Sequence, residues 1–249
     1  MYKGLKIRLA QGEPVIKDVH KVKLPELFRG MPELSPDKCP QECNECLKVC
    51  PAGAIKLNPL MIDLGKCTFC PECIEACPEG AIKFTNEYHL AASQREQLLF
   101  TGNTPFIKPK AASDQIKKHF GRSLKLRQVS AAGCNGCELE LNALGNVNFD
   151  MGRYGIEFVA SPRHADGIVI TGPVSKAMSL ALFDTLEAVP EPRIIIAFGA
   201  CAVSGGIFSD SDELDRSFFE KFKVDLFVPG CPPHPLTFIS GLLEWLGRK

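Results

Sequence analysis

The sequence predicts an α/β protein with two structured parts: a parallel sheet covered by helices, and before it a small α+β region. From residue 124 onward, short apolar runs alternate with helical stretches and Gly/Pro loops, which is typical of a parallel sheet covered on both faces. Residues 31–90 are instead rich in Cys, Pro and Glu and contain few large apolar side chains. Because such a segment cannot build much hydrophobic core, we expect bound metal to stabilise it.

The predicted sheet takes its strands from five apolar runs, at residues 124–129, 156–160, 167–171, 194–198 and 224–228. The alternation of apolar and polar residues predicts helices at residues 138–144, 174–186 and 236–246. We therefore assign residues 124–249 to the α/β part. In sheets of this kind, ligands bind beyond the carboxyl ends of the strands.

The remaining segments are predicted to be less regular. Residues 1–30 are expected to form an irregular basic arm, because Pro14 and Pro25 interrupt its short apolar pieces. Residues 91–123 are expected to be a linker. Within it, residues 93–100 and 113–120 could form short helices, each with a serine able to cap its first turn.

The charge of the chain is balanced overall but unevenly distributed. Lys+Arg and Asp+Glu both total 29, so net charge gives no argument for nucleic-acid binding. Residues 1–30 carry seven basic and three acidic side chains, residues 31–90 five and nine, and residues 91–130 eight and two. The basic segments are either ordinary solvated surface or docking surfaces for acidic partners or anionic lipid.

The chain contains no apolar run suited to export or to membrane insertion. Residues 1–30 lack the continuous apolar stretch of a signal peptide, and no run approaches the roughly 18–20 apolar residues of a membrane helix. We therefore expect a cytoplasmic protein without a transmembrane segment. In a reducing cytosol, twelve closely spaced cysteines indicate metal ligands rather than disulfides.

An internal repeat organises the first eight cysteines. Residues 43–56 match residues 70–83, and Cys39 and Cys67 open the two copies. The second copy reads Cys67-x2-Cys70-x2-Cys73-x3-Cys77-Pro78, a run in which three thiolates bind one [4Fe–4S] cluster and the fourth points to another. By this rule, one cluster is bound by Cys39, Cys43, Cys46 and Cys77. The other is bound by Cys67, Cys70, Cys73 and Cys50.

Residues 31–90 thus resemble the two-[4Fe–4S] ferredoxin family. The first copy departs from the pattern, because three residues rather than two separate Cys39 from Cys43. Cys39 is therefore the least secure of the eight ligands. Structural zinc is the alternative, since paired cysteines also bind zinc, but it does not explain two four-cysteine runs that each end in Cys-Pro.

The last four cysteines each follow the end of a predicted strand. Cys134 and Cys137 follow residues 124–129, Cys201 follows residues 194–198, and Cys231 follows residues 224–228. A parallel sheet brings such loops to one edge, where four thiolates could hold a third [4Fe–4S] cluster or, alternatively, zinc. A glycine lies one or two residues before each of these four cysteines. Because glycine has no side chain, backbone N–H groups have room to approach cluster sulfurs. Buried structural thiols are the remaining alternative.

The same segments carry a family resemblance. The sequence stretches 133–140, 161–166, 171–172, 199–208 and 229–233 resemble the small subunit of [NiFe] hydrogenases, most closely the membrane-bound, energy-converting branch that includes formate hydrogenlyase. The resemblance covers about residues 124–249, and a complex I subunit beside the quinone site shares the fold and several motifs. It implies a flavodoxin-like domain whose proximal [4Fe–4S] cluster, at Cys134, Cys137, Cys201 and Cys231, faces a separate large subunit carrying nickel and iron.

Two features separate this chain from its relatives. The complex I subunit has two adjacent cysteines at the first ligand position, whereas Cys134-x2-Cys137 is the hydrogenase arrangement. The fused ferredoxin region is a separate subunit in many relatives, so the fusion does not indicate which complex contains this chain. The resemblance further implies membrane ion-translocating subunits as partners, and a peripheral location on the cytoplasmic side of the membrane.

Other polar residues of these motifs receive simpler interpretations. Glu138 and Glu140 are expected to be solvated or to lie in a helix N-terminus, although proton transfer or partner contact is possible. Arg163 and His164 are expected to be surface or structural residues rather than groups that tune the cluster. Gly205-Gly206 lacks a following Lys-Ser/Thr, which excludes a phosphate-binding loop.

The sequence therefore predicts an electron-transfer subunit of a hydrogenase-type oxidoreductase complex, with no substrate chemistry on this chain alone. Electrons from a soluble ferredoxin or a partner oxidoreductase would pass through three [4Fe–4S] clusters to a [NiFe] large subunit. One alternative is a subunit of a nickel-free complex I-like or sulfur- or quinone-reducing complex. The other is a free polyferredoxin shuttle, against which the large α/β part argues.

Overall fold

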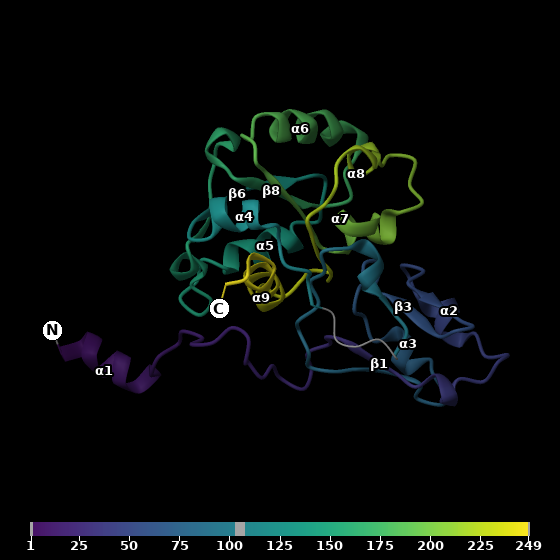
Figure 1. The fold of residues 1–249 in the computed structure, drawn as a ribbon. Coiled ribbons are helices and arrows are strands. Elements are labelled where there is room, and N and C mark those ends of the chain that lie inside the picture. Colours follow the sequence, from purple (N-terminus) through teal and green to yellow (C-terminus); the bar gives the residue numbers. More distant parts are fainter. Residues whose placement is uncertain (1, 103–107, 249) are drawn as a thin grey trace.

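A computed structural model describes residues 2–102 and 108–248 of the 249-residue chain. In Figure 1 the sheet-containing part and the cysteine-rich part lie against each other, and helix α1 (Tyr2–Gln11) projects away from both. None of the described helices is both long and apolar enough to cross a membrane.

The larger part is built on a sheet of five parallel strands. The spatial order is β10-β9-β8-β6-β7, all neighbours being parallel. The strands are β6 (Leu124–Ser130), β7 (Ile156–Phe158), β8 (Gly167–Thr171), β9 (Ile194–Phe198) and β10 (Leu226–Val228). Counted along the chain this is the order 2-1-3-4-5, which confirms the predicted flavodoxin-like fold.

Helices cover both faces of this sheet because alternate strand residues face opposite sides. Ile168 and Ile170 belong to one buried cluster and Val169 to another. The first cluster includes residues of α6 (Lys176–Glu187) and α8 (Ser217–Lys221), and the second includes residues of α5 (Gly136–Ala143) and α9 (Pro235–Leu246). The remaining helical elements here are α4 (Asp114–Phe120), α7 (Ala200–Ser204), η3 (Met151–Tyr154), η4 (Pro162–His164) and η5 (Gly206–Phe208).

The cysteine-rich part consists of short antiparallel strands and short helices. β1 (Pro32–Leu34) pairs with β4 (Ile82–Phe84), while β3 (Met61–Asp63) lies between β2 (Ile55–Lys56) and β5 (Leu99–Phe100). Its helical elements are η1 (Pro36–Lys38), α2 (Glu45–Val49), α3 (Glu72–Glu75) and η2 (Arg95–Leu98). The sequence repeat has a structural counterpart, because α2 followed by β2 corresponds to α3 followed by β4.

The two parts share a continuous core. One buried cluster runs from Leu34 and Ile62 in the cysteine-rich part to Val203 and Phe218 in the sheet part. In addition, Ala92 and Phe227 exchange backbone hydrogen bonds of 2.9 and 2.7 Å, which joins the first part to the edge strand β10. The cysteine-rich part is therefore fixed against the sheet.

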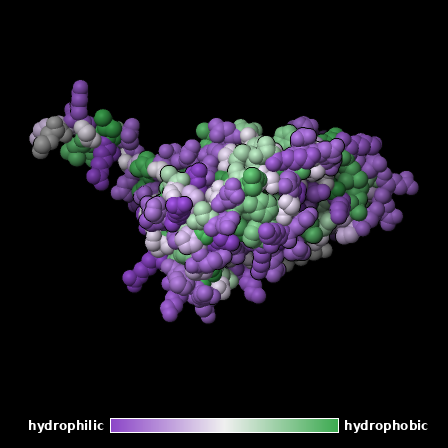
Figure 2. All heavy atoms as spheres, turned by 90° about the horizontal axis from the view of Figure 1, so that it is seen from above, coloured by the Kyte–Doolittle hydropathy of each residue, from purple (hydrophilic) through white to green (hydrophobic). Residues whose placement is uncertain are grey.

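Two local predictions were wrong in part. Residues 93–100 could form a short helix by sequence, and residues 95–98 do form the 3-10 helix η2, but residues 99–100 form β5, which pairs with β3, and Leu98 is fully buried. This ordered segment lies inside the predicted linker. The arm was expected to be irregular, yet residues 2–11 are helical before Pro14, with every described side chain exposed (Figure 2).

Other predicted elements agree with the structure. β8 and β9 have the predicted bounds. Helix α4 begins after Ser113, whose hydroxyl accepts a hydrogen bond from the Ile116 N–H at 3.3 Å. This is the predicted serine cap of the helix at residues 113–120.

Candidate metal centres

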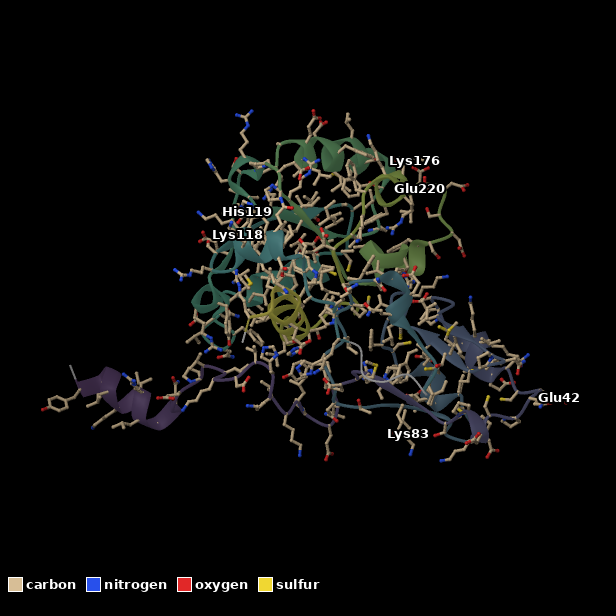
Figure 3. The ribbon with its side chains drawn as sticks, viewed as in Figure 1. Glu42, Lys83, Lys118, His119, Lys176 and Glu220 are labelled. Carbon is tan, nitrogen blue, oxygen red and sulfur yellow. The ribbon has the colours of Figure 1, made fainter. Side chains whose placement is uncertain are left out.

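The eight cysteines of the repeat gather in two groups of four, and sulfur atoms concentrate around α2, α3 and β3 in Figure 3. The first group lines one small cavity together with the apolar side chains of Leu60 and Ile82. Its members are Cys39, Cys43, Cys46 and Cys77. Burial raises the pKa of Cys39, and the neighbouring Cys43 and Cys77 thiols raise it further. The three-residue gap before Cys43 therefore does not keep Cys39 away from its group.

The second group combines the second run with one cysteine of the first. Burial raises the pKa of Cys67 to about 12, and the thiols of Cys73, Cys50 and Cys70 add to the effect. Burial likewise raises the pKa of Cys73 to about 11, again with contributions from Cys70 and Cys50. Each group thus contains three thiols of one run and the last thiol of the other.

Backbone N–H groups already point at sulfur in corresponding places of the two copies. The Ala54 N–H donates to Cys50 Sγ at 3.3 Å, and the Ala81 N–H donates to Cys77 Sγ at 3.2 Å. The Phe69 N–H donates to Cys67 Sγ at 3.3 Å. Such bonds favour the thiolate form, which is the form that binds metal.

The last four cysteines form a third group at the carboxyl edge of the large sheet. Cys134 and Cys137 follow β6, Cys201 lies in the first turn of α7 after β9, and Cys231 follows β10. Burial raises the pKa of Cys201 to about 11, and the Cys231 and Cys134 thiols contribute. Burial also raises the pKa of Cys137, helped by Glu138 and by the other three thiols. The loops lie near the β6/β8 switch point, where this fold binds ligands.

Glycines leave the space that these sulfurs occupy. Gly199, at φ +93°, has no side chain, and a Cβ there would lie 2.6 Å from Cys137 Sγ. A Cβ on Gly206, at φ +58°, would lie 3.0 Å from Cys201 Sγ. Gly199, two residues before Cys201, therefore makes room for Cys137, which belongs to a different loop.

The donor chemistry of the three groups is the same. A [4Fe–4S] cluster is held by four cysteine thiolates, each of which binds a different iron. All twelve cysteines are free thiols, so each group of four offers a donor set suited to [4Fe–4S].

The relative positions of the three groups follow from contacts between the segments that carry them. Helix α2 packs against α3, and Thr68 and Phe69, from the loop between Cys67 and Cys70, line one cavity with Cys231. Cys46, of the first group, is among the thiols that raise the pKa of Cys73 in the second. Burial raises the pKa of Cys231, followed by the effects of Cys134 and of Cys70, which belongs to the second group. Arg29 Nε donates to the Phe69 carbonyl at 2.6 Å, which fastens the loop between Cys67 and Cys70. The second group therefore lies between the other two.

A half-buried arginine that no sequence motif predicted lies beside the third group. The Arg216 guanidinium donates to the carbonyls of Cys201, Ala202 and Pro173 at 3.3, 2.8 and 3.2 Å. Burial lowers the pKa of Arg216 to about 10, and Arg95 lowers it further, whereas Cys201 acts in the opposite sense. Arg216 lies fifteen positions after Cys201, and no pattern in the sequence connects them.

Of the other motif residues, Glu138 lies in the first turn of α5, in agreement with one of the two expectations for it, but it is buried rather than solvated. Its Oε1 accepts hydrogen bonds from the hydroxyls of Ser130 at 2.7 Å and Thr171 at 2.5 Å, while Oε2 is buried without a partner. Burial alone would raise the pKa of Glu138, but these hydroxyls lower it below the ordinary value. Burial raises the pKa of Glu140.

Arg163 and His164 lie far from the third group. Both belong to η4, which immediately precedes β8 and therefore lies at the amino edge of the sheet. The cysteines lie at the opposite, carboxyl edge. This placement agrees with the expectation of surface or structural residues.

Comparison with known proteins identifies the family. The family model described as "NADH ubiquinone oxidoreductase, 20 Kd subunit" matches residues 134–245, and a "4Fe-4S binding domain" model matches residues 60–83. A probable membrane-bound hydrogenase subunit of Pyrococcus furiosus is 38% identical over 129 residues, which are 52% of this chain and 77% of that protein. The chain belongs to the 20 kDa subunit family.

Other relatives of this chain belong to different complexes. Formate hydrogenlyase subunit 7 of Escherichia coli is 41% identical over 132 residues, covering 53% of this chain and 52% of that protein. A subunit of the NADH-quinone oxidoreductase of Citrifermentans bemidjiense is 44% identical over 108 residues, covering 43% of this chain and 63% of that protein. The chain thus spans about half of the formate hydrogenlyase subunit. Together with the 4Fe-4S domain, the family identifies an iron–sulfur subunit of an oxidoreductase.

Proposed function

We propose that this chain holds three [4Fe–4S] clusters and relays electrons to or from a [NiFe] large subunit of a membrane-bound, ion-translocating complex. The arrangement of the twelve thiols as three groups in a row carries this proposal. The first cluster would be bound by Cys39, Cys43, Cys46 and Cys77. The second would be bound by Cys67, Cys70, Cys73 and Cys50, and the third by Cys134, Cys137, Cys201 and Cys231.

When bound, such clusters supply one-electron transfer at potentials set by their surroundings. The chain's own residues provide those surroundings. The apolar walls around Cys39 and Cys46 exclude water, N–H groups of Ala54, Phe69 and Ala81 stabilise thiolates, and the Arg216 guanidinium adds positive charge beside Cys201. No residue of this chain is assigned a bond-breaking role.

The third group supports a partner protein at the end of this row. Cys134 and Cys231 are exposed, as are the large apolar side chains of Leu139, Ile207 and Phe208 near the same loops. A cluster site at an apolar surface is suited to burial by another subunit. This feature favours a large partner over a free polyferredoxin shuttle. A soluble ferredoxin or a partner oxidoreductase would exchange electrons at the other end, and membrane ion-translocating subunits would complete the complex.

A nickel-free partner is the second candidate, because the NADH-quinone oxidoreductase relative is 44% identical to this chain where the two align. The spaced Cys134-x2-Cys137 pair supports the hydrogenase assignment. Metal analysis of the intact, active complex distinguishes the two. We expect nickel equimolar with this chain, and an active complex without nickel would contradict the [NiFe] assignment.

In the proposed arrangement the last cysteine of each run binds the cluster of the other run, and this can be tested by replacing that cysteine. With Cys77→Ser, iron content is expected to fall by about one third, since one of three equal clusters is lost. When the folded Cys77→Ser variant is alkylated under anaerobic conditions and the labelled sites are mapped by mass spectrometry, Cys39, Cys43 and Cys46 should be labelled. The matched variant Cys50→Ser should expose Cys67, Cys70 and Cys73 instead. Labelling of Cys67, Cys70 and Cys73 in the Cys77→Ser variant would show that each run keeps its own fourth ligand.

A further inference from the structure

A group of metal-ligating side chains lies apart from the cysteines. His20 of the arm, His89 of the segment after β4, and Glu244 of α9 bring their potential ligand atoms within 4.8 Å of one another. Within residues 2–102 and 108–248, no other three His, Cys, Asp or Glu side chains come as close. We propose that these three residues bind a single divalent transition-metal ion of the zinc type, which fastens the arm to the body of the protein.

The geometry is close to what a tetrahedral ion needs. Zn–N and Zn–O bonds of about 2.1 Å place neighbouring ligand atoms about 3.4 Å apart. His20 Nδ1 and Glu244 Oε1 are already 3.9 Å apart. The rings of His20 and His89 are nearly parallel, at 8°, with their centroids 6.2 Å apart. All three side chains are half-buried, so small side-chain movements suffice, and water can complete the coordination.

Glu87 orients His89 in the way that metal-binding histidines are usually oriented. A Glu87 carboxylate oxygen contacts His89 Nδ1 and also accepts the His89 backbone N–H at 2.8 Å. Metal-bound imidazoles commonly donate one ring N–H to a carboxylate and coordinate through the other nitrogen. His89 would therefore bind the ion through Nε2. This orienting carboxylate is a second observation, independent of the three candidate ligands.

The charges around the group favour a cation. Two neutral imidazoles and the carboxylates of Glu244 and Glu87 contribute two negative charges, which balance a divalent ion. The nearby lysines are paired with their own neighbours, Lys17 with Glu13 and Lys21 with Asp18, each at 3.0 Å. Arg248 is likewise engaged, because it donates hydrogen bonds to the carbonyls of Tyr154 and Phe120.

The ion would join three segments that are distant in sequence. Around His20 the arm is held by Tyr88, whose hydroxyl donates to the Val19 carbonyl at 2.6 Å and accepts the Val22 N–H at 3.1 Å, and before it by the Ile16 N–H, which donates to the Asn148 carbonyl at 2.8 Å. Val19 is buried, but Asp18 and Lys21 on either side of it are exposed. A metal bond from His20 to α9 would therefore stabilise the docked arm by binding only the docked form. This role is independent of the proposed electron transfer.

Zinc binding to the cluster-loaded full chain tests this proposal. Equilibrium dialysis against Zn²⁺, with zinc and iron measured together, should give one zinc per chain without loss of iron. His20→Ala, His89→Ala and Glu244→Gln should each weaken zinc binding at least tenfold. Glu87→Gln should weaken it about 10–100-fold, as expected for loss of an orienting carboxylate. The control His119→Ala removes an exposed histidine of α4, labelled in Figure 3, and should leave zinc affinity unchanged.

Limited proteolysis provides the second measurement. Zinc should slow tryptic cleavage after Lys17 and Lys21 in the unmodified chain and in His119→Ala, but not in His20→Ala. If the chain retains no zinc, or if all variants bind zinc as tightly as the unmodified chain, His20 and Glu244 form only a histidine–carboxylate pair and the proposal is wrong.

Discussion

Replacing Gly199 by alanine is expected to abolish the third cluster site while the first two remain loaded. Gly199 has φ +93° and ψ 155°, a conformation that essentially only glycine adopts and that costs another residue about 1–3 kcal/mol. The new Cβ would also lie 2.6 Å from Cys137 Sγ. Backbone strain and this clash both act on the loop that carries Cys201, so iron per chain should fall by about one third.

Gly247→Ala is the control for a positive φ without a clash at a cysteine sulfur. Gly247 also has a positive φ, +68°, but its Cβ would meet only Lys117, at an ordinary distance of 3.6 Å. We expect Gly247→Ala to retain all its iron. Full iron content in Gly199→Ala, with an unchanged spectrum of the third cluster, would show that Cys137 does not need the space beside Gly199.

Replacing Arg216 by glutamine is expected to lower the reduction potential of the third cluster. The guanidinium lies beside Cys201 and is half-buried, so its charge is poorly screened. Removing a positive charge makes the addition of an electron less favourable, and the potential therefore falls. At an effective dielectric constant of about 20, the lost interaction is about 1–2 kcal/mol, or roughly 40–90 mV for one electron.

A potentiometric titration followed by EPR measures this change. Arg216→Lys keeps the charge but not the three carbonyl contacts, so it should shift the potential less than half as far as Arg216→Gln. Equal shifts in the two variants would mean that Arg216 acts by positioning the backbone of Cys201 and Ala202. An upward shift in Arg216→Gln would contradict the electrostatic account.

The sequence predicted those features that depend on local pattern. β8 and β9 are fully buried runs between turn residues, and their predicted bounds agree with the structure. The helix predicted from residue 174 begins instead at Lys176, because Val174 has φ +66° and Ser175 takes the N-cap position. Boundaries of this kind depend on single backbone angles, which hydrophobic periodicity does not specify.

The assignment of the twelve thiols to three clusters stays a prediction, which is based on the cysteine spacing within each run and on strand ends at one sheet edge. The strand at residues 99–100 could not be predicted from the sequence, because it depends on pairing with β3, a non-local partner.

Other site features depend on tertiary packing and had no sequence signal. Glu138 was predicted either to be solvated or to lie in a helix N-terminus. It does lie in the first turn of α5, but its side chain is buried and reaches Ser130 and Thr171. Arg216 reaches Cys201 from a separate loop. His20, His89 and Glu244 are spread over almost the whole chain, so only the folded structure brings them together.

The central claim is that all twelve cysteines bind three clusters. Iron and acid-labile sulfide content of the anaerobically reconstituted chain, measured for the unmodified protein and for Cys134→Ser, tests it most directly. We predict about twelve irons and twelve sulfides per unmodified chain, since each cluster contributes four of both, and a loss of about four irons or a changed third-cluster spectrum in Cys134→Ser. About eight irons in both proteins, with identical spectra, would contradict it.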